Sequence, residues 1–271
     1  VLFRSFIASS VLMLIILCCS IFLNSAETIN KNSPFIKSNY AFNFSMFNNV
    51  IKTNEGKNVF ISPLSAHIAL GLLYNGARGE TNKAIAKALH LSGMDINLLA
   101  KANKDFYQHV KKLNKDITFL IANSIWTKIS ANPDFIRIGR EFYDAEVLPL
   151  PTGTTPVNNW IEKKTKGMLK NMLSSLDPLT VMLLINALYF KGDWQEKFNK
   201  EDTRDKEFYL TKFDKIMHPF MSMQEKFLYY NERNFQALKL NYKGKKTGMI
   251  IILPERDVNP VNFFKSIDGN M

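Results

Sequence analysis

The sequence is poor in the residues that build covalent cross-links and metal centres. It has two cysteines, Cys18 and Cys19, which are adjacent and lie in its most apolar stretch. Because no cysteine follows Cys19, a disulfide framework, a catalytic thiol and a cysteine-ligated zinc site are excluded from the rest of the chain. The four histidines stand at no spacing typical of metal ligands. We therefore expect neither a metal nor a cofactor.

Acidic residues are scarce relative to basic ones. The 24 Asp and Glu residues face 35 Lys and Arg residues, and the net charge of +11 favours polyanionic partners or negatively charged surfaces. A chain of 271 residues with 46% hydrophobic and 22% charged residues is globular and long enough to bury a core without cross-links. Low-complexity linkers and internal repeats are missing from the sequence, which gives no sign of a second domain.

The amino terminus has the anatomy of a secretory signal peptide. Arg4 precedes an apolar run from Val11 to Leu23, and the small residues Ser25 and Ala26 follow. A membrane anchor is the alternative, but the run is shorter than the ~20 apolar residues that a spanning helix needs. We predict that residues 1–26 are a signal peptide, that the mature chain 27–271 is secreted, and that no membrane span is left after cleavage. Cleavage would also remove both cysteines.

One sequon for N-glycosylation occurs in the chain, at Asn43-Phe44-Ser45. A secreted chain would meet the glycosylation machinery, so Asn43 is a candidate for modification. The alternative is that Phe44 lies on a buried helix face, which would leave the sequon unused.

Apolar residues recur at helical spacing in the first half of the mature chain. Ser62-Pro63 is a helix start, with serine as the cap and proline in the first turn. Further helices are predicted over residues 38–51, 81–89, 97–115, 133–143 and 157–173.

Strand patterns follow later in the chain. The nearly unbroken apolar run 181–190 is typical of a strand covered on both faces. Residues 237–241 and 247–253 are predicted to pair as a hairpin. Other strands are predicted over 117–127, 206–210 and 227–230. Because helices come first and strands mostly later, the order favours an α+β fold.

Several segments, in the same order along the chain, resemble the serpin family of serine protease inhibitors. The segment Asn58 to Ser65 and the turn Gly76 to Thr81 resemble the second serpin helix and its following turn. The segment Asn158 to Gly167 resembles serpin helix F, and Leu184 to Trp194 resembles the third strand of the main sheet. The resemblance implies helices packed on a large mixed main sheet with smaller sheets. It runs from about Tyr40 to the last residue and stops before the reactive-centre loop, so residues 27–271 are expected to be the amino-terminal two-thirds of a serpin domain.

The resemblance implies inhibition by a suicide-substrate mechanism. A serine protease, or in some cases a cysteine protease, cleaves an exposed loop and forms an acyl-enzyme, and the loop then inserts into the main sheet as a new strand. The complete protein is expected to be a secreted, monomeric inhibitor, and the fragment without the loop is expected to be inactive. The alternative is a non-inhibitory serpin that acts as a carrier, a chaperone or a glycosaminoglycan-binding protein.

Four residues are candidates for the parts of the fold that move during inhibition. Asn186 is a polar amide inside an apolar strand, so it needs hydrogen-bond partners, and Ser62 and Ser65 are the natural ones. The resemblance places these three in the serpin "shutter" and Trp194 at the "breach", where the loop enters the sheet. The alternatives are a helix cap at Ser62, a satisfied core amide at Asn186 and a core anchor at Trp194.

A lysine stripe on the predicted helix 97–115 is the candidate for polyanion binding. Its members lie opposite the apolar face and resemble the basic helix through which several serpins bind sulfated polysaccharides; they are Lys101, Lys104, Lys111, Lys112 and Lys115. The alternative is a solvated basic face. Nucleic-acid binding is not expected, because no aromatic residues are interleaved with the basic ones. No arrangement of nucleophile, acid and base is found, so we expect no enzyme activity.

Overall fold

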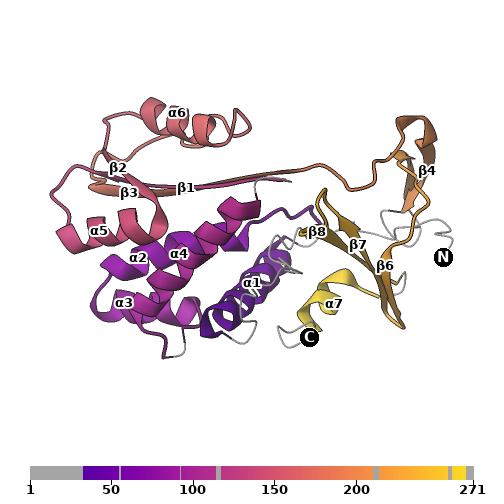
Figure 1. Ribbon diagram of the computed structural model, residues 1–271, viewed down its shortest axis with the longest axis horizontal. Coiled ribbons are helices and arrows are strands. Elements are labelled where there is room, and N and C mark those ends of the chain that lie inside the picture. Colours follow the sequence, from indigo (N-terminus) through magenta and orange to yellow (C-terminus); the bar gives the residue numbers. More distant parts are fainter. Residues whose placement is uncertain are drawn as a thin grey trace. The chain divides into compact units, whose positions relative to one another are not determined.

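The computed structural model describes residues 33–54, 56–91, 93–113, 117–209, 214–255 and 258–266. These residues form two compact units, which are described separately (Figure 1). The first unit holds residues 30–43 and 62–192, and the second holds residues 44–61 and 193–271. The predicted signal peptide, residues 1–26, lies outside the described residues, and the single-domain organisation of 27–271 stays a prediction. None of the described helices is long and apolar enough to cross a bilayer.

The first unit is built around a mixed three-stranded sheet in the order β2-β1-β3. The central strand β1 (Ile117–Thr127) pairs with β3 (Met182–Gly192) in antiparallel fashion along its whole length. On its other side it pairs in parallel with β2 (Ala145–Pro149). The register sets Asn123 of β1 directly opposite Asn186 of β3, so that two amides meet in the middle of an apolar sheet.

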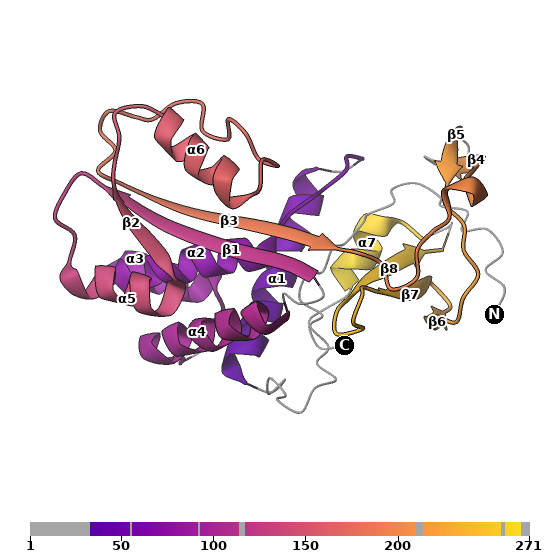
Figure 2. The same cartoon turned by 45° about the horizontal axis from the view of Figure 1, so that its top comes forward.

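Helices lie on both faces of this sheet (Figures 1 and 2). Helix α6 covers one face, where Trp126, Val157 and Trp160 form the centre of an apolar cluster. The helices on the opposite face contribute fully buried side chains such as Ile68, Leu72 and Leu99. The apolar run in β3 predicts covering on both faces, but within β3 only Ala187 is fully buried and most of the other residues are partly buried. The helices of this unit are α2 (Pro63–Gly76), α3 (Gly79–Ala88), α4 (Ile96–Leu113), α5 (Pro133–Tyr143) and α6 (Thr155–Lys164). Helix α1 (Pro34–Thr53) begins in this unit and ends in the second one.

Helix α6 is shorter than the predicted helix over 157–173, and that prediction was wrong beyond Lys164. The amide of Lys166 bonds the carbonyl of Lys163 at 3.3 Å, and the amide of Gly167 bonds the carbonyl of Glu162 at 2.8 Å. Lys166 and Gly167 both have positive φ, at 52° and 80°. This pair of bonds is the Schellman motif that ends helices, with Lys166 in the position where glycine is usual and Gly167 directly after it.

The second unit contains an antiparallel meander, β6 (Leu228–Glu232), β7 (Phe235–Asn241) and β8 (Gly248–Pro254). The predicted hairpin between 237–241 and 247–253 is confirmed by the pairing of β7 with β8. Helix α7 (Pro260–Ser266) contributes Phe263 and Phe264 to an apolar cluster with Ile51 of α1. A separate hairpin joins β4 (Arg204–Tyr209) to β5 (Lys215–Phe220), after a short 3-10 helix at Lys200–Asp202. The α+β prediction is confirmed.

Candidate functional site

The amino-terminal turn of α2 aims a serine hydroxyl at the sheet. Ser62 is the cap of this helix, and its hydroxyl accepts a hydrogen bond from the amide of Ser65 at 3.4 Å. Pro63 occupies the first turn, where no amide proton is needed. Held in this turn, Ser65 donates its own hydroxyl proton to Oδ1 of Asn186 on β3. The structure therefore brings Ser65 and Asn186 together and leaves Ser62 as the cap that orients Ser65.

The side-chain amide of Asn186 is hydrogen-bonded to a second side-chain amide on the neighbouring strand. Its Nδ2 donates to Oδ1 of Asn123 at 2.7 Å. Asn123, which is 1% exposed, in turn donates to the hydroxyl of Tyr107 on α4 and to the main-chain carbonyl of Tyr143 at 2.7 Å. One strand amide thus ties β3 to α4 and to the end of α5.

The hydroxyl of Tyr143 adds further links from the network to α2 and α4. It accepts hydrogen bonds from Nδ2 of Asn75 on α2, at 3.0 Å, and from Nδ2 of Asn103 on α4, at 3.4 Å. Burial raises the pKa of Tyr107 and of Tyr143 above the ordinary phenol value, so both are neutral at physiological pH. We call the connected residues the amide network; they are Ser65, Asn75, Asn103, Tyr107, Asn123, Tyr143 and Asn186.

Five members of the amide network were missed in the sequence. Asn123 had the same signal as Asn186, since it is a polar amide inside the predicted strand 117–127. Tyr107 and Tyr143 had no distinguishing signal, because a buried tyrosine looks like any core aromatic until its hydroxyl partner is known. Asn75 and Asn103 also have backbone acceptors within their own helices, the carbonyls of Gly71 and Leu99.

A buried histidine lies on the same helix as the cap serine. His67 is 0% exposed, and its ring lies edge-on to Phe35 and Phe42 of α1 with ring centres 5.7 and 5.5 Å away. Its Nε2 lies 3.4 Å from the hydroxyl of Ser38, and its Nδ1 has no hydrogen-bond partner. Burial lowers the pKa of His67 to about 4, so the ring is neutral at pH 7.

Trp194 belongs to the second unit. Its ring stacks on Tyr242 with the ring centres 4.8 Å apart and an angle of 11° between the planes, and its edge meets Phe198. Backbone bonds reinforce the contact, because Trp194 and Tyr242 form an isolated β-bridge. Trp194 therefore packs as an aromatic anchor, and a role at the breach stays a prediction.

The lysine stripe of α4 is partly neutralised by the neighbouring helix. Nζ of Lys104 lies 3.4 Å from Oε1 of Glu141, and Nζ of Lys111 lies 3.0 Å from Oδ2 of Asp144. Lys101 and Lys112 are exposed, and Lys115 lies outside the described residues. Carboxylates from the α5 segment thus already hold two of the ammonium groups that a polyanion would need.

The sequon asparagine is buried. Asn43 is 5% exposed on α1, and its amide nitrogen donates to Oδ1 of Asn39 at 3.0 Å. A glycan needs this nitrogen at the surface, so the burial argues against modification of the folded chain. Glycosylation at Asn43 stays a prediction.

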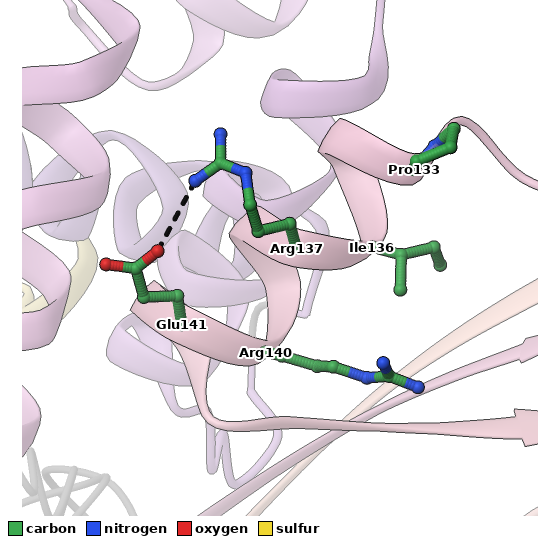
Figure 3. Close-up of a pocket in the computed structure, with 5 residues that line it drawn as sticks. All are labelled: Pro133, Ile136, Arg137, Arg140 and Glu141. Atoms are coloured by element: carbon green, nitrogen blue, oxygen red, sulfur yellow. Dashed lines mark hydrogen bonds and ion pairs between the residues drawn. The ribbon is translucent and has the colours of Figure 1, made fainter.

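Neither a metal-ligand cluster nor catalytic groups in the hollow on α5 are found among the described residues. No group of three or more His, Cys, Asp or Glu side chains among them could hold a metal ion. A shallow hollow on α5 is lined by Pro133, Ile136, Arg137, Arg140 and Glu141, all from one helix (Figure 3). Within it Arg137 pairs with Glu141 at 3.3 Å, and no nucleophile lines it.

Comparison with known proteins settles the family. The family model described as serpin, serine protease inhibitor, matches residues 37–268. The chain belongs to the serpin family. Leukocyte elastase inhibitor of Bos taurus is 32% identical over 247 residues, which cover 86% of this chain and 64% of that protein. The serpin resemblance of the sequence is confirmed, and the family is one of inhibitors, in agreement with the expectation that the chain is not an enzyme.

Solved serpin structures share the fold. The native state of the thermophilic serpin tengpin matches with a TM-score of 0.79 at 30% identity, covering 90% of this chain and 63% of tengpin. Cleaved kallistatin complexed with heparin matches with a TM-score of 0.78 at 22% identity, covering 86% of this chain and 71% of kallistatin. The chain spans 57% of the length of a serpin-like protein of Thermococcus kodakarensis and 64% of the length of the Bos taurus inhibitor.

Proposed function

We propose that the protein of which this serpin chain is part inhibits a serine protease by inserting its cleaved reactive loop into the sheet beside β3. The observation that carries the proposal is the position of β3. It is an outer strand of the order β2-β1-β3, eleven residues long, and its second edge has no strand partner among the described residues. An edge of that kind accepts an added strand through main-chain hydrogen bonds.

The amide network supports this proposal by fixing the middle of β3. Asn186 is bound from one side by Ser65 of α2 and from the other by Asn123 of β1. A strand that is anchored at its centre keeps its register while its outer edge exchanges partners. In this account Ser62, Ser65 and Asn186 act as the shutter and Trp194 acts at the breach.

The chemistry proposed for the loop uses the protease's own catalytic groups. The protease serine attacks a loop peptide bond and releases the new amino terminus, and the loop stays attached as an acyl ester. Insertion of the cleaved loop as a strand then carries the ester away from its water and distorts the protease, so that deacylation stops. A cysteine protease would form the corresponding thioester. The chain ending at Met271 contains no such loop in our account and would be inactive.

We also propose that the protein is secreted, on the strength of the signal-peptide pattern in residues 1–26, and that the complete serpin is a monomer. Amino-terminal sequencing of the product in the medium of secreting cells should find a start near residue 27. A product that retains residues 1–20 would contradict secretion through this segment.

The test of inhibition uses the protein expressed from its full reading frame. It is incubated with trypsin-, chymotrypsin- and elastase-like proteases, and the products are separated on a denaturing gel. We expect a complex with one of these enzymes that survives SDS, and none when the protease serine is blocked beforehand. The chain ending at Met271 is the matched control and should form no complex. Cleavage without any complex would favour the carrier function instead.

A further inference from the structure

Three polar groups stay unmatched where α2, α4 and α5 meet, on the face of the sheet opposite α6 (Figures 1 and 2). Oδ1 of Asn75 and Oδ1 of Asn103 have no hydrogen-bond partner among the described residues. The phenol oxygen of Tyr143 accepts hydrogen bonds from Nδ2 of both asparagines. This phenol donates to no acceptor in the described part of the chain, so its proton is the third unmatched group.

All three side chains are shut off from bulk solvent. Asn75 is 3% exposed, and Asn103 and Tyr143 are 0% exposed. Folded proteins pair nearly all of their buried polar groups, either with other protein groups or with ordered water, because an unpaired group loses its hydration without compensation. Three unmatched groups at one place therefore indicate a bound ligand.

The two amides cannot be turned over to pair these groups with one another. Nδ2 of Asn75 also donates to the carbonyl of Gly71 at 2.6 Å, and Nδ2 of Asn103 also donates to the carbonyl of Leu99 at 2.9 Å. Exchanging the nitrogen and the oxygen of either amide would set two acceptors against each other. The carbonyls of α2 and α4 therefore fix which amide atom is the nitrogen, and both amide oxygens stay unmatched.

Gly71 of α2 allows the three helices to approach one another closely at this point. A Cβ atom on Gly71 would lie 3.3 Å from the phenol oxygen of Tyr143 and 3.8 Å from Nδ2 of Asn103. Both amide nitrogens bond the same phenol, and the oxygen and nitrogen of an amide are attached to one carbon. The two unmatched oxygens therefore lie close to the unmatched phenol proton.

The chemistry of the three groups selects the ligand. Two of them are acceptors and one is a donor, so the ligand must donate two hydrogen bonds and accept one. An anion has no proton for the amide oxygens. A metal ion cannot accept the phenol proton, and the phenol oxygen already accepts two N–H groups. A water molecule meets both requirements, is small enough for a buried site, and typically makes about three hydrogen bonds in protein interiors.

We propose that Asn75, Asn103 and Tyr143 bind one buried water molecule that joins α2, α4 and α5. The water donates to both amide oxygens and accepts the phenol proton, which matches every polar group at the site. It completes the part of the amide network that lies beneath the sheet. The proposal is independent of protease inhibition, because it concerns only the packing of the three helices.

The test counts slowly exchanging internal waters in the protein expressed from its full reading frame. The amplitude of deuterium magnetic relaxation dispersion in the solvent is proportional to their number. Asn75→Leu and Asn103→Leu each remove one amide oxygen that holds the water, so each variant should lose about one such water per molecule. The helix carbonyls that these amides bond keep their main-chain partners, and thermal melts check that the variants fold.

The matched control is Asn158→Leu. Asn158 is also a buried amide, but its nitrogen donates to the carbonyl of Leu173 at 2.8 Å and its oxygen accepts from the amide of Leu173 at 2.9 Å. Both ends of this amide are paired with protein, so the control should keep the number of internal waters.

A crystal structure of the parent protein provides a second readout that needs no variant. At a resolution that shows ordered waters, we expect one water oxygen within about 2.7–3.2 Å of both unmatched amide oxygens and of the phenol oxygen of Tyr143. The proposal is overturned if this water is not seen or if the phenol donates directly to either amide oxygen. It is also overturned if Asn75→Leu and Asn103→Leu keep the parent's count, or if Asn158→Leu loses as many waters as they do.

Discussion

The two compact units use polar side chains in opposite ways. In the unit that contains residues 62–192, amides and phenols are buried and bonded to one another, and Asn123 at 1% exposure has three partners. In the unit that contains residues 193–271, the comparable groups lie at the surface or are partly buried, apart from the buried Tyr242. Tyr230 is 55% exposed and donates to Glu232, and every residue of β6 is exposed. Buried hydrogen bonds are costly to break and surface ones are not, so the same substitution should have different effects in the two units.

The largest contrast is expected from replacing a buried amide. Asn123→Leu would leave the amide of Asn186, the hydroxyl of Tyr107 and the carbonyl of Tyr143 without their partner. We expect a loss of about 3 kcal/mol or more in the free energy of unfolding, from about 1–3 kcal/mol for each stranded group. The matched change in the second unit is Gln236→Leu, which removes a bond to Glu255 at 3.1 Å and a bond from the exposed hydroxyl of Tyr229 at 3.2 Å. Its expected cost is below about 1 kcal/mol, and denaturant melts of both variants would measure the difference. Equal costs would contradict the comparison.

A pH-dependent contrast is expected from His67. Its pKa is about 4 in the folded chain, against about 6.5 when unfolded, so the unfolded state binds more protons as the pH falls between these values. The contribution of the neutral His67 ring to the free energy of unfolding is complete above about pH 6.5 and is lost progressively toward pH 4. By pH 5 the free energy of unfolding should have fallen by about 2 kcal/mol. Denaturant melts at pH 7 and pH 5 measure it.

Two variants isolate the contribution of this ring. His67→Gln should lower the pH dependence by the stated amount, whereas His90→Gln, at an exposed position in the same unit, should leave it in place. A parent and a His67→Gln variant with the same pH dependence would show that the buried ring does not control acid stability.

The smallest contrast is expected from two hydroxyl deletions. Tyr143→Phe removes the acceptor that Asn75 and Asn103 share, but both amides keep a backbone acceptor, so we expect a loss of about 1 kcal/mol. Tyr230→Phe removes an exposed bond to Glu232 and should change stability by less than about 0.5 kcal/mol. Thermal melts of the two variants provide the comparison. A larger loss of stability from Tyr230→Phe than from Tyr143→Phe would contradict the contrast between the two units.

Much of the fold could be predicted because its signals are local. Ser62-Pro63 marks a helix start by capping chemistry alone, and the apolar run in β3 marks a strand. Strand β2 could not be predicted, since it follows α5 through Asp144 at a φ of 51° without the glycine that usually signals such a turn. Strand β5 contains Pro219, which argues against a strand when its edge position is unknown.

The candidate site was predictable only where a residue disagreed with its surroundings. Asn186 could be singled out because an amide in an apolar strand needs partners, and Asn123 carried the same information. Tyr107 and Tyr143 could not be found in this way, because their hydroxyl partners come from other elements of the fold. For the lysines, the sequence gives their number and helical spacing, but pairing with Glu141 and Asp144 depends on how α4 and α5 pack.

The central claim is that β3 accepts an inserted strand, and the change in stability on loop cleavage tests it most directly. The protein from the full reading frame is cut in its exposed loop by limited proteolysis, and the melting temperatures of the intact and cut forms are compared. Insertion beside β3 would add a row of main-chain hydrogen bonds. We predict a rise of about 10 °C or more, which corresponds to several kcal/mol at about 2–4 °C for each kcal/mol. An unchanged or lower melting temperature after cleavage would contradict the account.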